Sequence, residues 1–246
     1  MMSRFNEIEV YDAEIPEHVR LHLLARKTDM MIEFLGHLNR EQARGVDLGC
    51  GTGWHVQRLR DKGFMAFGID NSTVQLHQAQ TKRVSHRPGE NDCWCLGDIQ
   101  HLPYATESMD FAFAINAIHH LESRQAQRET VQEIHRILKP DGLFFLHEIN
   151  TNNLVMSTYM NYIFPRLRRI DNGYENWILP DSLRDWSGFK VVQVVTFTFV
   201  PDFTPRILFP LLRRIEGWLE RGPLGRYAAH YMAVLQKEGP TSADTN

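Results

Sequence analysis

The sequence predicts an α/β fold in which a doubly wound, mostly parallel sheet is covered by helices on both faces. Strand-like and helix-like segments alternate through the first 150 residues, as they do in repeated strand–helix units. The strand-like segments are apolar without an alternating pattern, which is typical of strands buried on both faces. A glycine-rich turn directly after the first of these strands also favours such a sheet.

The elements of this sheet can be placed in order along the chain. Apolar residues at helical spacing between Val19 and Leu38 predict one or two helices before the first strand. The turn Lys139-Pro140-Asp141-Gly142 ends the last helix between strands, because it places Pro and Gly where turns favour them. The predicted strands are 45–48, 65–69, 93–96, 111–116 and 143–149, and the predicted helices between them are 54–62, 74–84 and 125–138.

The pattern changes after Asn150. Residues 190–200 and 227–237 are further strand candidates, and two apolar and basic segments, 153–170 and 205–221, are additions that we expect to form a helical cap. We therefore divide the chain into N-terminal helices or a flap (1–44), a core (45–150), the C-terminal half of the same domain with cap insertions (151–238) and a polar tail (239–246).

The composition excludes several classes of protein. The 246 residues carry a net charge of −3 with a pI near 6.5, which argues against a nucleic-acid binder that relies on a positive field. No stretch approaches the roughly 18 apolar residues of a membrane span, and the N-terminus lacks the apolar region of a signal peptide. The three cysteines are too few for a disulfide framework, so we expect a cytoplasmic protein with reduced thiols.

The densest signal is the segment Val46-Asp47-Leu48-Gly49-Cys50-Gly51-Thr52-Gly53, which joins the first strand to a helix. Its glycines occupy alternate positions, whereas many dinucleotide-binding turns have the order G-x-G-x-x-G. Asp47 would repel a pyrophosphate but could attract a cationic group. Asp70 ends the second strand, where it can accept hydrogen bonds from ribose hydroxyls, and Asp98 follows the third strand, where it can accept from an adenine amino group. The structural alternatives are a turn former for Asp47, a helix N-cap for Asp70 and an Asx turn for Asp98.

In these residues the sequence resembles the class I S-adenosylmethionine-dependent methyltransferases, close to the type 11 branch. The resemblance extends over residues 45–150 through an ordered set of motifs: Gly68-Ile69-Asp70, Gly97-Asp98-Ile99, Met109-Asp110-Phe111, Asn116-Ala117-Ile118-His119-His120-Leu121 and residues 133–142. It implies a Rossmann-like sheet of seven strands whose last strand, 227–237, is antiparallel. It also implies S-adenosylmethionine as the cofactor and methyl transfer as the reaction.

The resemblance assigns parts of the cofactor to particular residues. Asp47 and the glycine turn would hold the methionine part, Asp70 the ribose, and Asp98 with Ile99 the adenine. Asn116 would line the end of the fourth strand near the sulfonium. The complete set of cofactor-binding candidates is Asp47, Gly49, Cys50, Gly51, Gly53, Asp70, Asn71, Asp98, Ile99 and Asn116.

Three residues are candidates for acid–base catalysis. His119 and His120 follow the fourth strand on the ligand-facing edge, and an imidazole with an ordinary pKa near 6.5 can take a proton from a hydroxyl or ammonium acceptor. Glu148 ends the fifth strand on the same edge, where it would orient substrate or cap the next segment. Capping and packing roles are also open for both histidines, and no base is needed when the acceptor has no proton to lose. The cysteine and histidine spacings lack the further ligands of a metal site, so we expect none.

The segment 205–221 places apolar side chains at helical spacing, with arginines among them. We expect the chain itself to cover this apolar face, as a cap over the carboxyl edge of the sheet that selects the acceptor. A hydrophobic acceptor, a partner copy and an anionic membrane surface are the alternatives. A second basic cluster, Arg166, Arg168 and Arg169, is consistent with peripheral membrane contact, and Pro210 in the middle of the pattern predicts a kink.

The leading function is therefore a methyltransferase that uses S-adenosylmethionine and a small organic or lipid-like acceptor. The alternative is a catalytically silent S-adenosylmethionine-binding protein with a regulatory or scaffold role, since an intact cofactor site reports binding and not turnover. A nicotinamide-dependent oxidoreductase is disfavoured by Asp47 and by the glycine spacing. No nucleic-acid partner is expected, and the sequence does not specify the acceptor or the oligomeric state.

Overall fold

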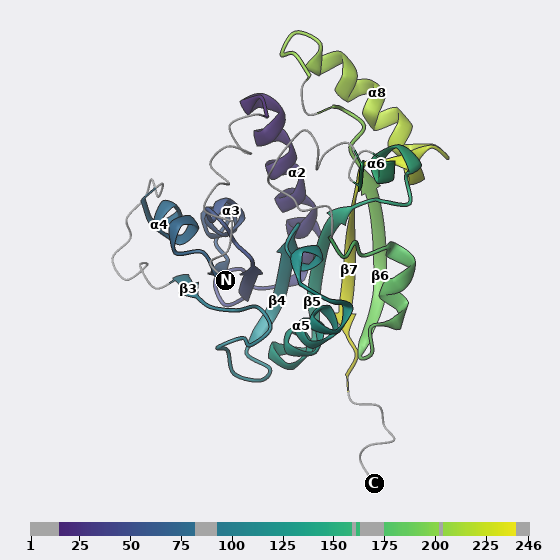
Figure 1. The fold of residues 1–246 in the computed structure, drawn as a ribbon. Coiled ribbons are helices and arrows are strands. Elements are labelled where there is room, and N and C mark those ends of the chain that lie inside the picture. The colour runs from purple at the N-terminus through teal and green to yellow at the C-terminus, as the bar shows by residue number, and fades with distance from the viewer. Residues whose placement is uncertain (1–14, 82–92, 159–160, 163–174, 202–203, 240–246) are drawn as a thin grey trace.

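The computed structural model describes residues 15–81, 93–158, 161–162, 175–201 and 204–239. Seven strands form one sheet in the order β3-β2-β1-β4-β5-β7-β6 (Figure 1). Strands β1 to β5 are parallel, whereas β7 is antiparallel to both β5 and β6, so the predicted sheet with its antiparallel last strand is confirmed. The strands are β1 Arg44–Leu48, β2 Met65–Asp70, β3 Trp94–Leu96, β4 Met109–Ile115, β5 Leu138–Ile149, β6 Phe189–Phe197 and β7 His230–Lys237.

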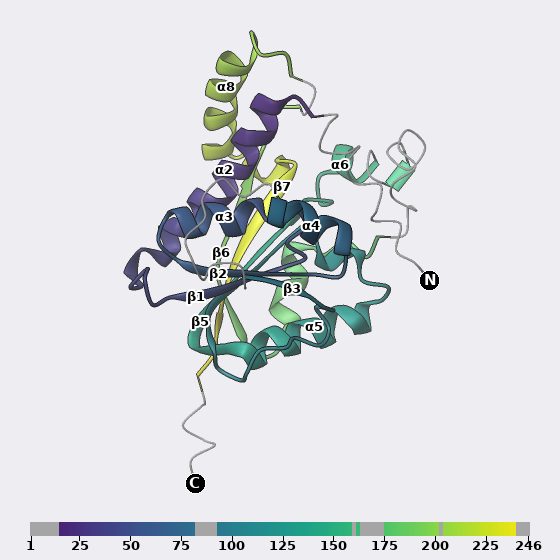
Figure 2. The same ribbon diagram turned by 90° about the vertical axis from the view of Figure 1, so that its left-hand side faces the viewer.

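Helices cover both faces of the sheet (Figure 2). The helices are α2 Glu17–Phe34, α3 Trp54–Asp61, α4 Thr73–Thr81, α5 Arg124–Ile137, α6 Leu154–Thr158 and α8 Phe209–Arg221. In β4, Phe111 and Phe113 belong to the core under α2, α3 and α4, whereas the alternating Ala112 and Ala114 belong to the core under α5. Burial on both faces explains why the strand sequences are apolar without alternation.

The N-terminal region forms α2 as one continuous helix up to Phe34, in agreement with the expectation of one or two helices before the first strand. Another segment differs from the sequence-based expectations. The predicted turn at residues 139–142 lies within β5 as a bulge: Met109 pairs with Leu138, but Phe111 pairs with Leu143. Asp141 takes the left-handed conformation that such an excursion requires, with φ of 63°.

The largest difference concerns α8, which lies beside α2 beyond one end of the sheet (Figures 1 and 2). The expectation that the chain covers the apolar side of this segment is wrong, because Ile207 is 87% exposed and Trp218 is 72% exposed. The helix begins at Phe209, so Pro210 occupies its first turn, where no backbone N–H is needed, and does not kink it. Residues 166, 168 and 169, which form the second basic cluster, lie outside the described residues.

Strands β1 and β4 pack so closely at Gly45 that no side chain fits at this position. A Cβ atom at this position would lie 2.1 Å from the ring of Phe111, which is completely buried. We expect Gly45→Ala to lower the free energy of unfolding by roughly 1–3 kcal/mol, as overpacking does, in chemical denaturation. Gly36→Ala is the matched control, because a Cβ there meets no atom within 4 Å. Equal stability of the two variants would contradict this packing argument.

Candidate active site

The candidate site lies at the edge of the sheet where the parallel strands end. Strand order runs β1-β2-β3 in one direction and β4-β5 in the other, so the loops after β1 and β4 leave in opposite directions. Such a reversal point opens a crevice at the carboxyl edge, where ligands of α/β proteins bind. The glycine turn, Asp70, Asn116 and Glu148 all follow or end strands at this edge.

The glycine turn is held close to its neighbours. Gly49, Gly51 and Gly53 have positive φ angles of 77°, 52° and 74°. A Cβ atom would lie 2.7 Å from Ala117 at Gly49 and 2.1 Å from the Trp94 ring at Gly53, so neither position tolerates a side chain. At Gly51 the nearest atom would be an oxygen of Gln75 at 3.8 Å, which leaves space beside the backbone for a ligand.

Asp47 precedes this turn and is the least satisfied charged group in the site. Its side chain is 1% exposed, and neither carboxylate oxygen has a hydrogen-bond partner among the described residues. Burial, followed by repulsion from Asp70, raises the pKa of Asp47 well above its ordinary value. A buried carboxylate without a partner is costly, and a cationic group of a ligand would supply one. The surroundings of Asp47 therefore fit the ammonium group of the cofactor that the resemblance implies.

Asp70, at the end of β2, is hydrogen-bonded to the glycine turn. One of its oxygens accepts a hydrogen bond from the Gly51 N–H at 2.8 Å, and the other accepts from the Ser72 N–H at 2.9 Å. A carboxylate has about four acceptor positions, so these two contacts leave room for two ribose hydroxyls. Asn71, the next residue, is exposed.

The remaining cofactor candidates are Asp98, Ile99 and Cys50, and they differ in exposure. Asp98 is exposed and accepts a hydrogen bond from the Gln100 N–H at 2.9 Å, so the structure contains the Asx turn that was the alternative for this residue. Ile99 is half-buried against the core. The Cys50 side chain is buried, and its Sγ atom lies 2.7 Å from the position of a Cβ on Gly68 and 3.9 Å from the Gly51 carbonyl oxygen, so this side chain packs inside the turn.

Asn116 directly follows β4 and has a strained backbone conformation. Its φ angle is 53°, which is uncommon outside glycine but tolerated by asparagine. The Asn116 N–H donates to the His147 carbonyl at 3.0 Å, and Asn116 Oδ1 accepts from His147 Nδ1 at 2.9 Å. Burial lowers the pKa of His147 well below its ordinary value, so this imidazole is neutral at neutral pH.

The structure adds polar residues to this edge that the sequence analysis missed. Helix α2 contributes Lys27, which is 8% exposed, and Thr28, whose Oγ1 lies 2.9 Å from His55 Nδ1. Burial and then the charge of Lys27 lower the pKa values of His55 and His230 to about 3. One signal was present in the sequence: Lys27 lies one turn before the buried Met31, on the inward side of α2.

Two of the three catalytic candidates form a direct pair. His119 Nδ1 lies 2.5 Å from Glu148 Oε2, and both side chains are buried. The His119 ring stacks on Trp177 with centroids 4.7 Å apart. His120 is exposed and its ring centroid lies 4.0 Å from that of His119. The two histidines therefore differ in their surroundings, because the His119 ring is buried against a carboxylate and the His120 side chain is exposed.

A network of hydrogen bonds keeps the chain segment around Trp177 against His119. The Asn176 N–H donates to the His119 carbonyl at 3.0 Å, and Asn176 Nδ2 donates to the Leu121 carbonyl at 2.9 Å. Gln127 Nε2 donates to the Asn176 carbonyl at 2.7 Å, and Arg124 donates to the Trp177 carbonyl at 2.6 Å. These contacts fix the aromatic face that covers the His119 ring.

Neither a metal cluster nor a membrane span is found in the described part of the chain. No group of three or more His, Cys, Asp or Glu residues in it could hold a metal ion. None of its helices combines the length and the apolar character that crossing a membrane requires.

Comparisons with known proteins show similarity to methyltransferases. A model of the type 11 methyltransferase-domain family matches residues 46–146. The sterol 24-C-methyltransferase of Schizosaccharomyces pombe is 25% identical over 202 residues, which cover 81% of this chain and 48% of that protein. The malonyl-[acyl-carrier protein] O-methyltransferase of Erwinia pyrifoliae is 31% identical over 111 residues, which cover 45% of this chain and 39% of that protein.

A SAM-dependent methyltransferase of Thermotoga maritima shares the fold. The two structures have a TM-score of 0.61 at 19% sequence identity, over 94% of this chain and 100% of that chain. The chain spans less than half the length of the two curated relatives described above.

The raised pKa of Asp47 predicts a pH-dependent stability. An unfolded Asp ionises near pH 4, so unfolding releases a proton between that pH and the raised native pKa, and the free energy of unfolding should fall by up to about 1.4 kcal/mol per pH unit in this window. Asp47→Asn cannot ionise, so it should remove this slope and be more stable than the wild type at pH 8. Denaturation of the ligand-free proteins from pH 4 to 8 measures the difference.

Asp29→Asn is the control for this measurement, because the Asp29 side chain is 58% exposed. It should leave the pH slope unchanged. Parallel profiles for the wild type and Asp47→Asn would show that the Asp47 carboxyl titrates normally, which would remove the reason to place a cation beside it.

Proposed function

We propose that the chain, which the type 11 methyltransferase-domain model matches over residues 46–146, is a class I S-adenosylmethionine-dependent methyltransferase that methylates a small organic or lipid-like acceptor. The observation that carries the proposal is Asp47, a buried carboxylate without a described protein partner beside the glycine turn. One relative is named for a sterol and another for an acyl group on a carrier protein, which supports an organic acceptor rather than a nucleic acid.

In this proposal the site binds the cofactor through three carboxylates and the glycine turn. Asp47 holds the ammonium group of the methionine part, and Asp70 accepts from the ribose hydroxyls with the lone pairs that Gly51 and Ser72 do not use. Asp98 and Ile99 lie at the adenine, and Asn116 lines the end of β4. When bound, S-adenosylmethionine supplies a methyl group on a positively charged sulfur, where an acceptor nucleophile can displace it in line.

Positioning supplies most of the rate enhancement for such a displacement. Alignment of two bound reactants contributes up to roughly 7–11 kcal/mol, whereas a general base adds about 10²–10⁴-fold and only for an acceptor that loses a proton. His119 is the base in this proposal. With Nδ1 donating to Glu148, the imidazole lone pair lies on Nε2, and the buried carboxylate stabilises the imidazolium that proton transfer produces.

The test is methyl transfer from labelled S-adenosylmethionine to fractions of a metabolite and lipid extract. The wild type should bind the cofactor in calorimetry and label at least one fraction. His119→Gln and Glu148→Gln should retain cofactor binding but lower the rate of labelling by about 10²–10⁴-fold for an acceptor that loses a proton.

Asp47→Asn should weaken cofactor binding itself, by roughly tenfold or more in calorimetry, because it removes a charge-assisted contact.

His120→Gln is the matched control, since this histidine is adjacent but exposed. Its labelling rate should stay within a few-fold of the wild type. Cofactor binding without a labelled product in any fraction would favour a binding protein over an enzyme, and a folded wild type that binds no cofactor would overturn the proposal.

A further inference from the structure

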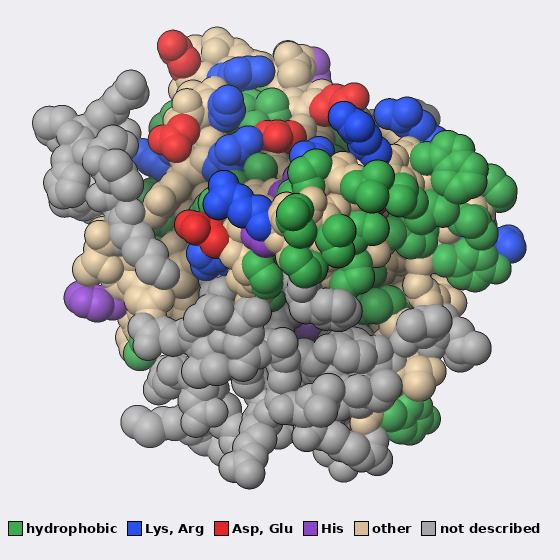
Figure 3. All heavy atoms as spheres, turned by 90° about the horizontal axis from the view of Figure 1, so that it is seen from above, with side chains coloured by type: hydrophobic (Ala, Val, Ile, Leu, Met, Phe, Trp, Pro, Cys, Tyr) green, Lys and Arg blue, Asp and Glu red, His purple; other side chains and the backbone are tan. Residues whose placement is uncertain are grey.

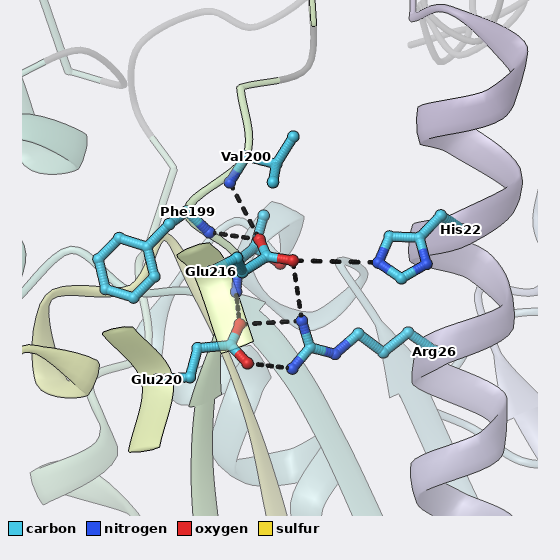
Figure 4. Close-up of polar contacts among 7 residues, drawn as sticks. His22, Arg26, Phe199, Val200, Glu216 and Glu220 are labelled. Atoms are coloured by element: carbon cyan, nitrogen blue, oxygen red, sulfur yellow. Dashed lines mark hydrogen bonds and ion pairs between the residues drawn. The ribbon is translucent and has the colours of Figure 1, made fainter. Parts of the chain in front are cut away.

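Helix α8 is attached to the protein through its charged side. Glu216 is only 3% exposed, and its Oε1 atom accepts hydrogen bonds from the N–H groups of Phe199 and Val200 at 2.7 and 3.0 Å. Its other oxygen lies 3.5 Å from Arg26 Nη1 and 4.0 Å from His22 Nε2, both on α2 (Figure 4). This carboxylate therefore links α8 to the end of β6 and to α2.

Glu220, one turn further along α8, repeats the same arrangement. It forms two contacts with the Arg26 guanidinium, at 2.9 and 2.5 Å, and accepts from the Thr198 N–H at 2.8 Å (Figure 4). Burial is the largest of the effects that lower the pKa of His22 to about 4, so His22 is neutral at neutral pH. Arg26 is therefore the cation of this cluster that faces both carboxylates.

This attachment directs the opposite side of the helix to solvent. Leu211 and Trp218 on that side are 58% and 72% exposed, and Ile207 just before the helix is 87% exposed. We define the α8 apolar face as the exposed apolar residues of this segment: Ile207, Leu208, Leu211, Ile215, Trp218, Leu224 and Tyr227. A space-filling view shows hydrophobic side chains gathered on this part of the molecule, with Lys and Arg side chains along their border (Figure 3).

Arginines border the α8 apolar face. Arg214 lies one helical turn from both Leu211 and Trp218, and Arg221 follows Trp218 by three residues, so both lie next to the apolar stripe. Arg226 lies over the Tyr227 ring at 4.8 Å. The only acidic residues between 205 and 227 are Glu216 and Glu220, and both are turned inward. The outward surface of this segment is therefore apolar and positively charged.

The charge of this surface distinguishes between possible partners. A second copy of the chain docked face to face would place arginines against arginines, and like charges in contact are destabilising. An anionic bilayer places lipid phosphates at the level of the arginines and acyl chains at the level of the apolar side chains. Interfacial helices with Trp, Leu and Ile on one side and a basic border bind such surfaces.

We propose that the α8 apolar face binds an anionic membrane surface, with α8 lying in the plane of the interface. The proposal does not depend on methyl transfer, because it concerns a surface formed by α8 and not the residues at the carboxyl edge of the sheet. Membrane binding would nevertheless bring the protein to the bilayer in which a lipid-like acceptor resides.

Vesicle flotation with the full-length protein tests this proposal. The protein should float with vesicles of phosphatidylcholine containing roughly one-third phosphatidylglycerol and bind phosphatidylcholine alone more weakly, and high salt should reduce flotation. The double variant Leu211→Ser/Trp218→Ser should lower the bound fraction at least about tenfold. Arg214→Gln/Arg221→Gln should weaken binding to the anionic vesicles and flatten the salt dependence.

The control is Val192→Ser/Val194→Ser, which changes two exposed apolar residues on β6, 46% and 37% exposed, and should float like the wild type. Thermal melting checks that every variant is folded. Failure of the wild type to bind anionic vesicles, or equal binding by Leu211→Ser/Trp218→Ser, would overturn the proposal. So would a wild-type dimer in sedimentation that the same double variant converts to a monomer, because a second copy would then cover the face.

Discussion

Parallel pairing of the strands is the constraint on which the candidate site depends. Because β1, β2, β4 and β5 run in the same direction, the residues that follow them arrive at one edge, however far apart they lie in the sequence. The antiparallel β7 begins at this edge and adds His230. The reversal of strand order between β1 and β4 then separates the loops and leaves a crevice between them.

The protein concentrates unfavourable features at this edge. The buried atoms without a hydrogen-bond partner among the described residues include both oxygens of Asp47, Nε2 of His147 and Oε1 of Glu148. Asn116 has a strained backbone conformation in the same region. Unsatisfied polar atoms and strain both lower stability, and they are typical of sites whose partner is a ligand rather than the protein itself.

In helix α8 the buried polar groups are satisfied, and the unfavourable feature is an exposed apolar side. Burial of two carboxylates is unfavourable unless they are paired and hydrogen-bonded, and here Arg26 and three backbone N–H groups satisfy them. Leaving the apolar side of α8 in water is unfavourable, and Leu211 and Trp218 on that side are 58% and 72% exposed. An apolar surface of this kind with a basic border is typical of interaction sites.

The sequence by itself determined the order and type of most elements, because buried parallel strands, amphipathic helices and a glycine turn leave local patterns. It also predicted that Asp47, Asp70 and Glu148 lie at the carboxyl ends of their strands, because strand ends can be read from the apolar pattern. It could not determine which side of α8 faces inward, because an amphipathic pattern does not specify the partner, and Arg26 lies 190 residues before Glu216. The pairing of His119 with Glu148 and the arrival of Lys27 at the site likewise depended on packing between separate elements, and only the tertiary structure decided them.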